Sequence, residues 1–193
     1  MTEPLLRVYF DFVDPLSYVA SRLLEPLGGE PLGAKVEWVG FELRPPPEPL
    51  TTTDDPIWSS RREAAKARAE ELGLLLKPPA LVPWTRKAHE LHTLAAEQGE
   101  ADAVRAAVFD AYFAAGRDIG RVDVLVEIGA AAGLDRTETK AVLDVDRHEA
   151  DVASARREAR EAGVSDVPSL SVGGRLPEGF PDLADLGTLL PVP

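Results

Sequence analysis

Residues 6–28 read LRVYFDFVDPLSYVASRLLEPLG, and within this segment a strand pattern passes directly into a helix pattern. Residues 6–13 are rich in β-favouring side chains and alternate with a period of two, which predicts a buried strand. Asp14 and Pro15 then have the form of an N-cap and a proline in the first helical turn. Apolar residues recur at helical spacing over residues 16–27, and the glycine that follows is expected to end the helix.

The rest of the chain divides into a helical block and a short return to strand. Residues 35–41, KVEWVGF, predict a second strand, so the chain opens β-α-β with parallel strands and a right-handed crossover. Residues 44–58 hold three consecutive prolines and the run TTTDDP, which indicates a loop. From residue 60 to about residue 163 we find only helical patterns, separated by glycines. A strand with a proline at its start is expected at 167–172, followed by a partner strand at 175–176 and a closing helix near 183–190.

Two capping signals place helix starts within the helical block. Residues 60–63, SRRE, have the form of a capping box, and the helix that follows is expected to end at Gly73. Asp135, with Glu138 three residues later, is expected to cap a short helix. The charge-rich run RREAAKARAEE at 61–71 is expected to be a solvated helix face with local ion pairs. Further helices are expected at about 84–98, 104–115, 122–132 and 152–162.

Length and composition exclude several classes of protein. The 193 residues suffice for one domain, or for one domain that carries a large insertion. The 33 acidic residues exceed the 21 Lys and Arg residues, and a net charge of -12 argues against nucleic acid or an anionic membrane as the main partner. The chain has no cysteine, which excludes a disulfide scaffold, a thiolate nucleophile and a zinc site with sulfur ligands. Without a visible signal peptide or an apolar run of membrane-spanning length, a cytoplasmic protein is expected.

Several segments together resemble the DsbA-like thioredoxin-fold family. FDFVDPLSY at 10–18 resembles the segment in which a strand of that family runs into its Cys-Pro-x-Cys motif. FELRP at 41–45 is similar to a segment of the FrnE-like and 2-hydroxychromene-2-carboxylate isomerase branches. KAHELHTLAAEQG at 87–99 and AVFDAYFAAGRDIG at 107–120 resemble insertion helices of the FrnE-like branch. GVSDVPSLSVGGR at 163–175 resembles the family's cis-proline segment, so the resemblance covers nearly the whole chain in the expected order.

The resemblance implies an α/β thioredoxin-like fold with a large all-helical insertion. The thioredoxin-like domain would comprise residues 1–58 and 164–193, and the insertion would comprise residues 59–163, with its last helix able to pack on the thioredoxin-like part. At the redox motif the chain reads DPLS over residues 14–17, so both cysteines are replaced. Disulfide exchange needs an attacking thiolate and a resolving thiol, and this chain has neither.

The resemblance also places a ligand cleft between the two parts, with Asp14, Ser17 and His89 as candidate catalytic residues. In the isomerase and kappa glutathione transferase branches, a serine at the first motif position donates a hydrogen bond to the glutathione thiolate. An ionised Asp14 cannot donate, and it would be a second anion at one helix N-terminus, whereas Ser17 could donate if it points into the cleft. Glutathione is therefore a candidate cofactor for which weak or absent binding is expected. The residues expected to contact a ligand are Phe12, Pro15, Trp84, Val167 and Pro168.

Each candidate also has a purely structural interpretation. Asp14 is a good N-cap, Ser17 can bond back to its own helix, and His89 can be an ordinary half-buried histidine, although it matches a family histidine that faces the cleft. The resemblance implies a cis bond before Pro168, with the Val167 backbone free to pair with an extended substrate. Histidines 89 and 92 lie three residues apart without an evident third ligand, so no metal site is expected.

Three functions remain open at the level of sequence. The chain can be a non-redox member of the family that binds an extended peptide or a small molecule in the cleft. It can be an isomerase or transferase that uses glutathione or another thiol. It can also use the cleft in a structural, chaperone-like role. Neither catalysis nor an oligomeric state follows from the residues.

Overall fold

The computed structural model describes residues 5–24 and 35–173 of the chain. A three-stranded sheet has the order β2-β1-β5, in which β1 (Leu5–Phe10) pairs parallel with β2 (Lys35–Gly40) and antiparallel with β5 (Ser169–Val172). Helix α1 (Pro15–Leu24) connects β1 to the segment before β2. The predicted β-α-β opening is therefore confirmed. The predicted end of the first helix, the strand at 175–176 and the closing helix lie outside the described residues.

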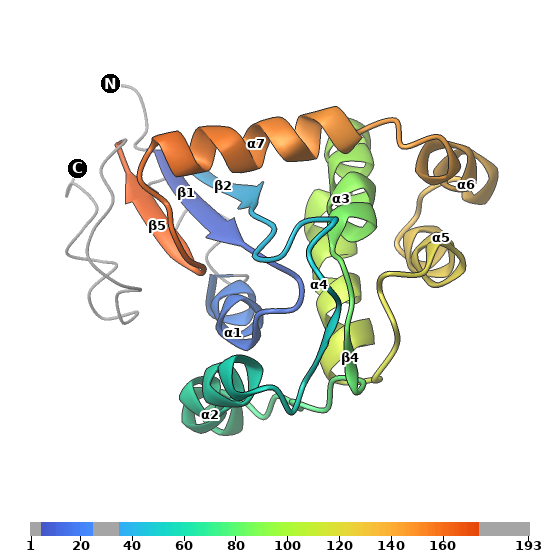
Figure 1. Ribbon diagram of the computed structural model, residues 1–193. Helices are drawn as coiled ribbons and strands as arrows, with labels where there is room; N and C mark the ends of the chain where they lie inside the picture. The colour runs from blue at the N-terminus through green and yellow to red at the C-terminus, as the bar shows by residue number, and fades with distance from the viewer. Residues whose placement is uncertain (1–4, 25–34, 174–193) are drawn as a thin grey trace.

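The helical part lies beyond the carboxyl end of β1, and its last helix returns to the sheet (Figure 1). Helix α7 packs on both β2 and α3, while α1 and α2 lie side by side. None of the helices in the described ranges combines the length and the apolar character that a membrane span requires. The helices of this part are α2 (Pro56–Glu71), α3 (Arg86–Gln98), α4 (Ala101–Phe113), α5 (Val122–Ala131), α6 (Arg136–Asp144) and α7 (Glu149–Glu161).

The two predicted helix caps have different outcomes. Asp135 caps α6 by accepting a hydrogen bond from the Glu138 backbone N–H at 2.8 Å, as predicted. The predicted start of α2 is wrong, because its cap is Asp55, which accepts a hydrogen bond from the Ile57 N–H at 2.9 Å. Asp55 is followed by proline, so α2 begins five residues earlier than predicted, with the same Asp-Pro pair that begins α1.

A second, two-stranded sheet was not expected. Its strands β3 (Thr51–Thr52) and β4 (Leu81–Val82) are antiparallel, and β4 falls within the block for which only helices were predicted. Two residues per strand are too few for an alternating pattern to be visible in the sequence. The pairing depends on a contact between segments 30 residues apart, which a local pattern does not report.

An aromatic core joins the sheet to the helical part. The rings of Phe10 and Phe12 meet edge to face at 5.0 Å, and Phe109 of α4 lies 5.1 Å from Phe12. All three side chains are completely buried. The turn that follows β1 is therefore anchored on both parts of the molecule, and this turn carries the candidate residues.

Candidate functional site

Asp14 lies at the start of α1 and is completely buried. Its Oδ2 accepts hydrogen bonds from the backbone N–H and the hydroxyl of Ser17, both at 2.7 Å. Its Oδ1 accepts a hydrogen bond from Arg61 Nη1 at 3.0 Å. Burial raises the pKa of Asp14 to about 6, although Arg61 and Ser17 act in the opposite direction. Asp14 is thus an N-cap and at the same time a buried, charge-paired carboxyl group.

Arg61 of α2 connects three segments of the chain. Its Nη1 donates to Asp14 Oδ1 and, at 3.3 Å, to the carbonyl oxygen of Val167, while its Nη2 donates to Asp166 Oδ1. The guanidinium carbon lies 5.8 Å from the ring centre of Trp58, which is itself buried. The prediction that the charged run of this helix is solvated is therefore wrong for Arg61. Its partners are 47 and 106 residues away in sequence, so the local pattern could not reveal them.

The Val167–Pro168 peptide bond is cis, and the backbone of Val167 is already engaged. Its N–H donates to Asp166 Oδ1 at 2.9 Å, and its carbonyl accepts from Arg61. The expectation that this backbone is free to pair with an extended substrate is therefore wrong for this structure. The side chains of Arg61 and Asp166 occupy the two groups that a peptide would use.

Ser17 does not present a donor to a ligand. Its side chain is completely buried, its hydroxyl donates to Asp14 Oδ2, and it lies 3.4 Å from the Asp11 backbone N–H, from which it accepts. The expectation that Ser17 could donate into the cleft is not met, because the neighbouring carboxylate accepts its only hydroxyl proton.

A groove of about 480 Å3 lies beside Arg61, between α1, α2 and the segment that precedes Pro168. A ligand in this groove can reach Arg61 and Asp166, but Asp14 lies behind Arg61 and has no exposed surface. The groove is lined by Leu16, Pro56, Ile57, Ser60, Arg61, Ala64, Asp166 and Val167.

His89 lies in the interior, beneath the turn rather than in the groove. Its Nε2 forms a hydrogen bond with Asp11 Oδ1 at 3.2 Å, and Asp11 Oδ2 accepts from the Leu43 N–H at 2.7 Å. A Cβ atom on Gly40 would lie 2.5 Å from His89 Nδ1, so only glycine leaves room for this ring. Asp11 was not among the sequence candidates. The available signal was a carboxylate between Phe10 and Phe12 in an otherwise apolar strand pattern.

The remaining candidates do not gather at the groove. Phe12 belongs to the aromatic core, and Trp84 is 38% exposed, with its indole N–H donating to the Glu48 carbonyl at 2.8 Å. Pro15 and Pro168 are buried beside groove residues. Burial lowers the pKa of His92 to about 3, so this ring is neutral at physiological pH. Residues 5–24 and 35–173 contain no group of three or more side chains that could hold a metal ion.

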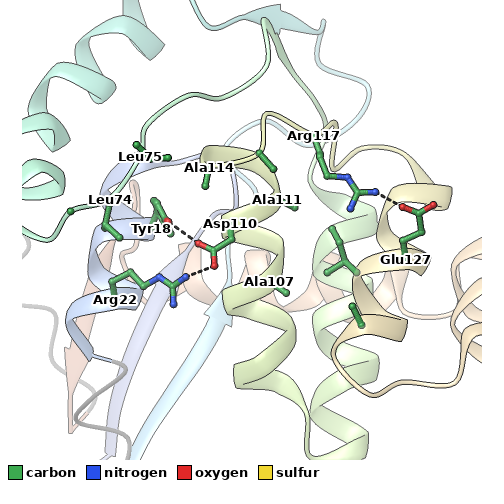
Figure 2. Close-up of a pocket in the computed structure, with 14 residues that line it drawn as sticks. Tyr18, Arg22, Leu74, Leu75, Ala107, Asp110, Ala111, Ala114, Arg117 and Glu127 are labelled. Carbon is green, nitrogen blue, oxygen red and sulfur yellow. Dashed lines mark hydrogen bonds and ion pairs between the residues drawn. The ribbon is translucent and has the colours of Figure 1, made fainter.

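A second groove, of about 760 Å3, lies between α1, α4 and α5 (Figure 2). At one end Asp110 accepts a hydrogen bond from the Tyr18 hydroxyl at 2.8 Å and pairs with Arg22. Burial and the Asp110 hydrogen bond raise the pKa of Tyr18 to about 12. At the other end Arg117 pairs with Glu127. This groove is larger than the one beside Arg61, but it contains none of the candidate residues.

Comparison with known proteins identifies the family. The model of the DSBA-like thioredoxin domain matches residues 5–190. The chain belongs to the DsbA-like thioredoxin family. It contains no cysteine at all. The thiol chemistry of the family is therefore not available to this chain.

Three relatives show how far the similarity extends. The chain is 30% identical over 177 residues to the "uncharacterized protein YwbO" of Bacillus subtilis (strain 168). The aligned region covers 87% of this chain and 86% of the relative. The "probable DsbA oxidoreductase SCO1869" from Streptomyces coelicolor is similar in structure with a TM-score of 0.75 and 25% identity, over 88% of this chain and 80% of that one. A 2-hydroxychromene-2-carboxylate isomerase is similar with a TM-score of 0.74 and 20% identity, over 89% and 87% of the chains, and shares the fold.

Proposed function

We propose that this chain is a non-redox member of the DsbA-like family that reversibly binds a small molecule in the groove beside Arg61. The observation that supports this proposal is the arrangement of Arg61 between Asp14 and Asp166. It holds a guanidinium group beside Asp14, the residue that the resemblance aligns with the first cysteine of the family motif, and it borders a groove of about 480 Å3. That volume falls within the range of about 300–1,000 Å3 typical of small-molecule sites.

A small molecule is favoured over an extended peptide as the occupant. Peptide recognition by strand addition requires free backbone N–H and C=O groups at the edge that receives the peptide. In this structure both groups of Val167 have intramolecular partners, Asp166 and Arg61. A peptide would have to displace both side chains before pairing, whereas a small molecule can enter the groove with both in place.

A thiol-dependent isomerase or transferase is the alternative that the family suggests. Against it stand the carboxylate of Asp14 at the thiol position and the hydroxyl of Ser17, which already donates to that carboxylate. We therefore expect no measurable glutathione binding by titration calorimetry at neutral pH. Micromolar affinity that survives Asp14→Ala but falls with Ser17→Ala would contradict the proposal and favour the thiol-dependent function.

The proposal is tested by mapping where small probes bind. Neutral, cationic, anionic and zwitterionic fragments are titrated into the isotope-labelled full chain and followed by amide NMR shifts. We expect shifts for residues that line the groove, including Ile57 and Val167. A bound fragment should lose affinity with Ile57→Asp, since Ile57 is 63% exposed in this groove. The matched control is Leu75→Asp, 48% exposed in the groove of Figure 2. Shifts confined to that second groove would contradict the proposal.

A further inference from the structure

The guanidinium group of Arg61 has hydrogen-bonding capacity that the described residues do not use. A guanidinium has five N–H donors in a planar fork. Arg61 donates from Nη1 to Asp14 and Val167 and from Nη2 to Asp166. Among residues 5–24 and 35–173, no acceptor is found for Nε–H, and Asp166 is the one acceptor found for Nη2. Nε and Nη2 lie along one edge of the guanidinium, and such an edge matches the two oxygens of a carboxylate.

Asp166 offers the complementary group in the same groove. Its Oδ1 accepts from both Arg61 and the Val167 N–H. In the described part of the chain, no donor bonds to its Oδ2, and the side chain is 62% exposed. An unused carboxylate oxygen and an unused guanidinium edge therefore line one groove.

The charges at this place disfavour a ligand with a single charge. Asp14, Arg61 and Asp166 together bring two carboxyl groups and one guanidinium group to this place. A simple anion would meet the carboxyl groups, and a simple cation would meet the guanidinium group of Arg61. A ligand with an anion and a cation on adjacent atoms complements both groups.

The rest of the groove is apolar. Leu16, Pro56, Ile57 and Ala64 contribute its walls, and Ile57 is the most exposed large hydrophobic side chain among them. Such walls favour an aliphatic or aromatic body on the ligand, since contact removes apolar surface from water.

From these features, and resting on the proposed function, we infer that the groove binds a zwitterion, namely an α-amino acid with an apolar side chain. Its carboxylate binds the Nε and Nη2 edge of Arg61, its ammonium group binds Asp166, and its side chain lies on the apolar walls. Arg61 is held from two sides by carboxylates, so it is oriented before the ligand arrives.

Three matched probes test the inference. Leucine has both charges, isocaproate has the same carbon skeleton without the ammonium group, and leucine amide lacks the carboxylate. Titration calorimetry with the full chain at neutral pH should show leucine binding about tenfold or more tightly than either analogue, because each analogue loses one charge-assisted interaction.

Two variants assign the two ends of the ligand. Arg61→Gln should weaken leucine about tenfold and leave leucine amide unchanged, because the amide has no carboxylate to lose. Asp166→Asn should weaken the binding of leucine by a similar factor and should not weaken the binding of isocaproate. Asp166 is exposed, so this variant tests the inference even if Arg61→Gln does not fold. The control is the exposed pair Arg121 and Asp123, where Arg121→Gln and Asp123→Asn should change nothing.

The outcomes separate this inference from the proposed function. If isocaproate or leucine amide binds as tightly as leucine, or if Asp166→Asn leaves leucine binding unchanged, the zwitterion is overturned while binding in the groove stands. The zwitterion is also overturned, while binding in the groove stands, if leucine, isocaproate and leucine amide all fail to bind and other fragments still shift the amide signals of groove residues. If no probe of any charge reaches the groove, both proposals are overturned.

Discussion

Two helices of this protein begin with the same Asp-Pro pair, and their surroundings differ completely. At α1, Asp14 is completely buried and accepts three hydrogen bonds, one of them from Arg61. At α2, Asp55 is partly exposed and its side chain accepts one, from the Ile57 N–H. The capping role is common to both, because it depends only on residues of the first turn. Asp14 is in addition enclosed by other segments of the chain, and this burial raises its pKa.

Helix α2 accounts for the difference. It lies beside α1 and carries Arg61 over the Asp14 carboxylate (Figure 1). A carboxylate enclosed in this way loses hydration and gains a cation as partner. Asp55 precedes the first turn of α2 itself and is partly exposed. A strong local capping signal therefore does not by itself indicate a functional residue. The effect of covering the cap with Arg61 can be tested in four ways.

The largest effect is expected from removing the cation. Arg61→Ala leaves the buried Asp14 without its charged partner and should lower the free energy of unfolding by about 4 kcal/mol at neutral pH. Chemical denaturation measures this value. Arg121→Ala, which removes one partner of an exposed ion pair, should have little effect. Equal losses in the two variants would show that Arg61 is no more than a surface charge.

The second-largest effect is expected in the pH dependence of the free energy of unfolding, which should distinguish the Asp14 cap from the Asp55 cap. The pKa of Asp14 is raised from 3.8 to about 6, so between these values the folded state binds more protons than the unfolded state. Stability should therefore fall as the pH rises through this window, by up to about 3 kcal/mol, with the full loss present above pH 6. Asp14→Asn should remove this slope, and Asp55→Asn should retain it. A slope that persists in Asp14→Asn would assign the titration to another group.

A thiol placed at each cap should report the same difference on a smaller scale. In Asp14→Cys, the burial that outweighs Arg61 at the carboxyl group acts on the sulfur too, and its pKa should lie above the ordinary value of about 8.5. In Asp55→Cys the sulfur is at a partly exposed helix N-terminus, so a pKa below about 8.5 is expected. Thiolate absorbance against pH measures both without background, because the natural chain has no cysteine. Coincident titration curves would contradict the effect of burial at the Asp14 position.

The smallest effect is expected at the plain cap. Asp55→Ala removes one N-cap hydrogen bond and should lower the free energy of unfolding by about 1 kcal/mol. Thermal or chemical denaturation at neutral pH measures this loss. A loss as large as that of Arg61→Ala would mean that the caps are equivalent after all.

Much of the fold could be predicted from local patterns. The β-α-β opening, the Asp135 cap of α6 and the helical block are confirmed, because each depends on residues within a few positions of one another. The start of α2 was misplaced because two capping signals lie close together, and the Asp-Pro pair prevails over the capping box at residues 60–63. Strand β4 was missed because its two residues carry no pattern of their own.

The candidate site was predicted less completely. Asp14 and the Val167–Pro168 segment were candidates from the sequence and the family resemblance. Arg61, Asp166 and Asp11 were not among the candidates. Arg61 belongs to a run of charges that is typical of a solvated helix face, and nothing in the run distinguishes it from Arg62. Its burial depends on where α2 lies against α1, which is a property of packing.

The fold class followed from the family resemblance of several segments, whereas the residues alone determined the position of the turn after β1 and the loss of thiol chemistry, through local periodicity, capping and the absence of cysteine. Only the tertiary structure decided that Asp14 is covered by Arg61, that the Val167 backbone is occupied, and that a groove with both charges lies beside them. These features join residues 47 and 106 positions apart. Local sequence patterns report which conformation a segment prefers, whereas the burial and charge of a side chain depend on which distant segments pack against it.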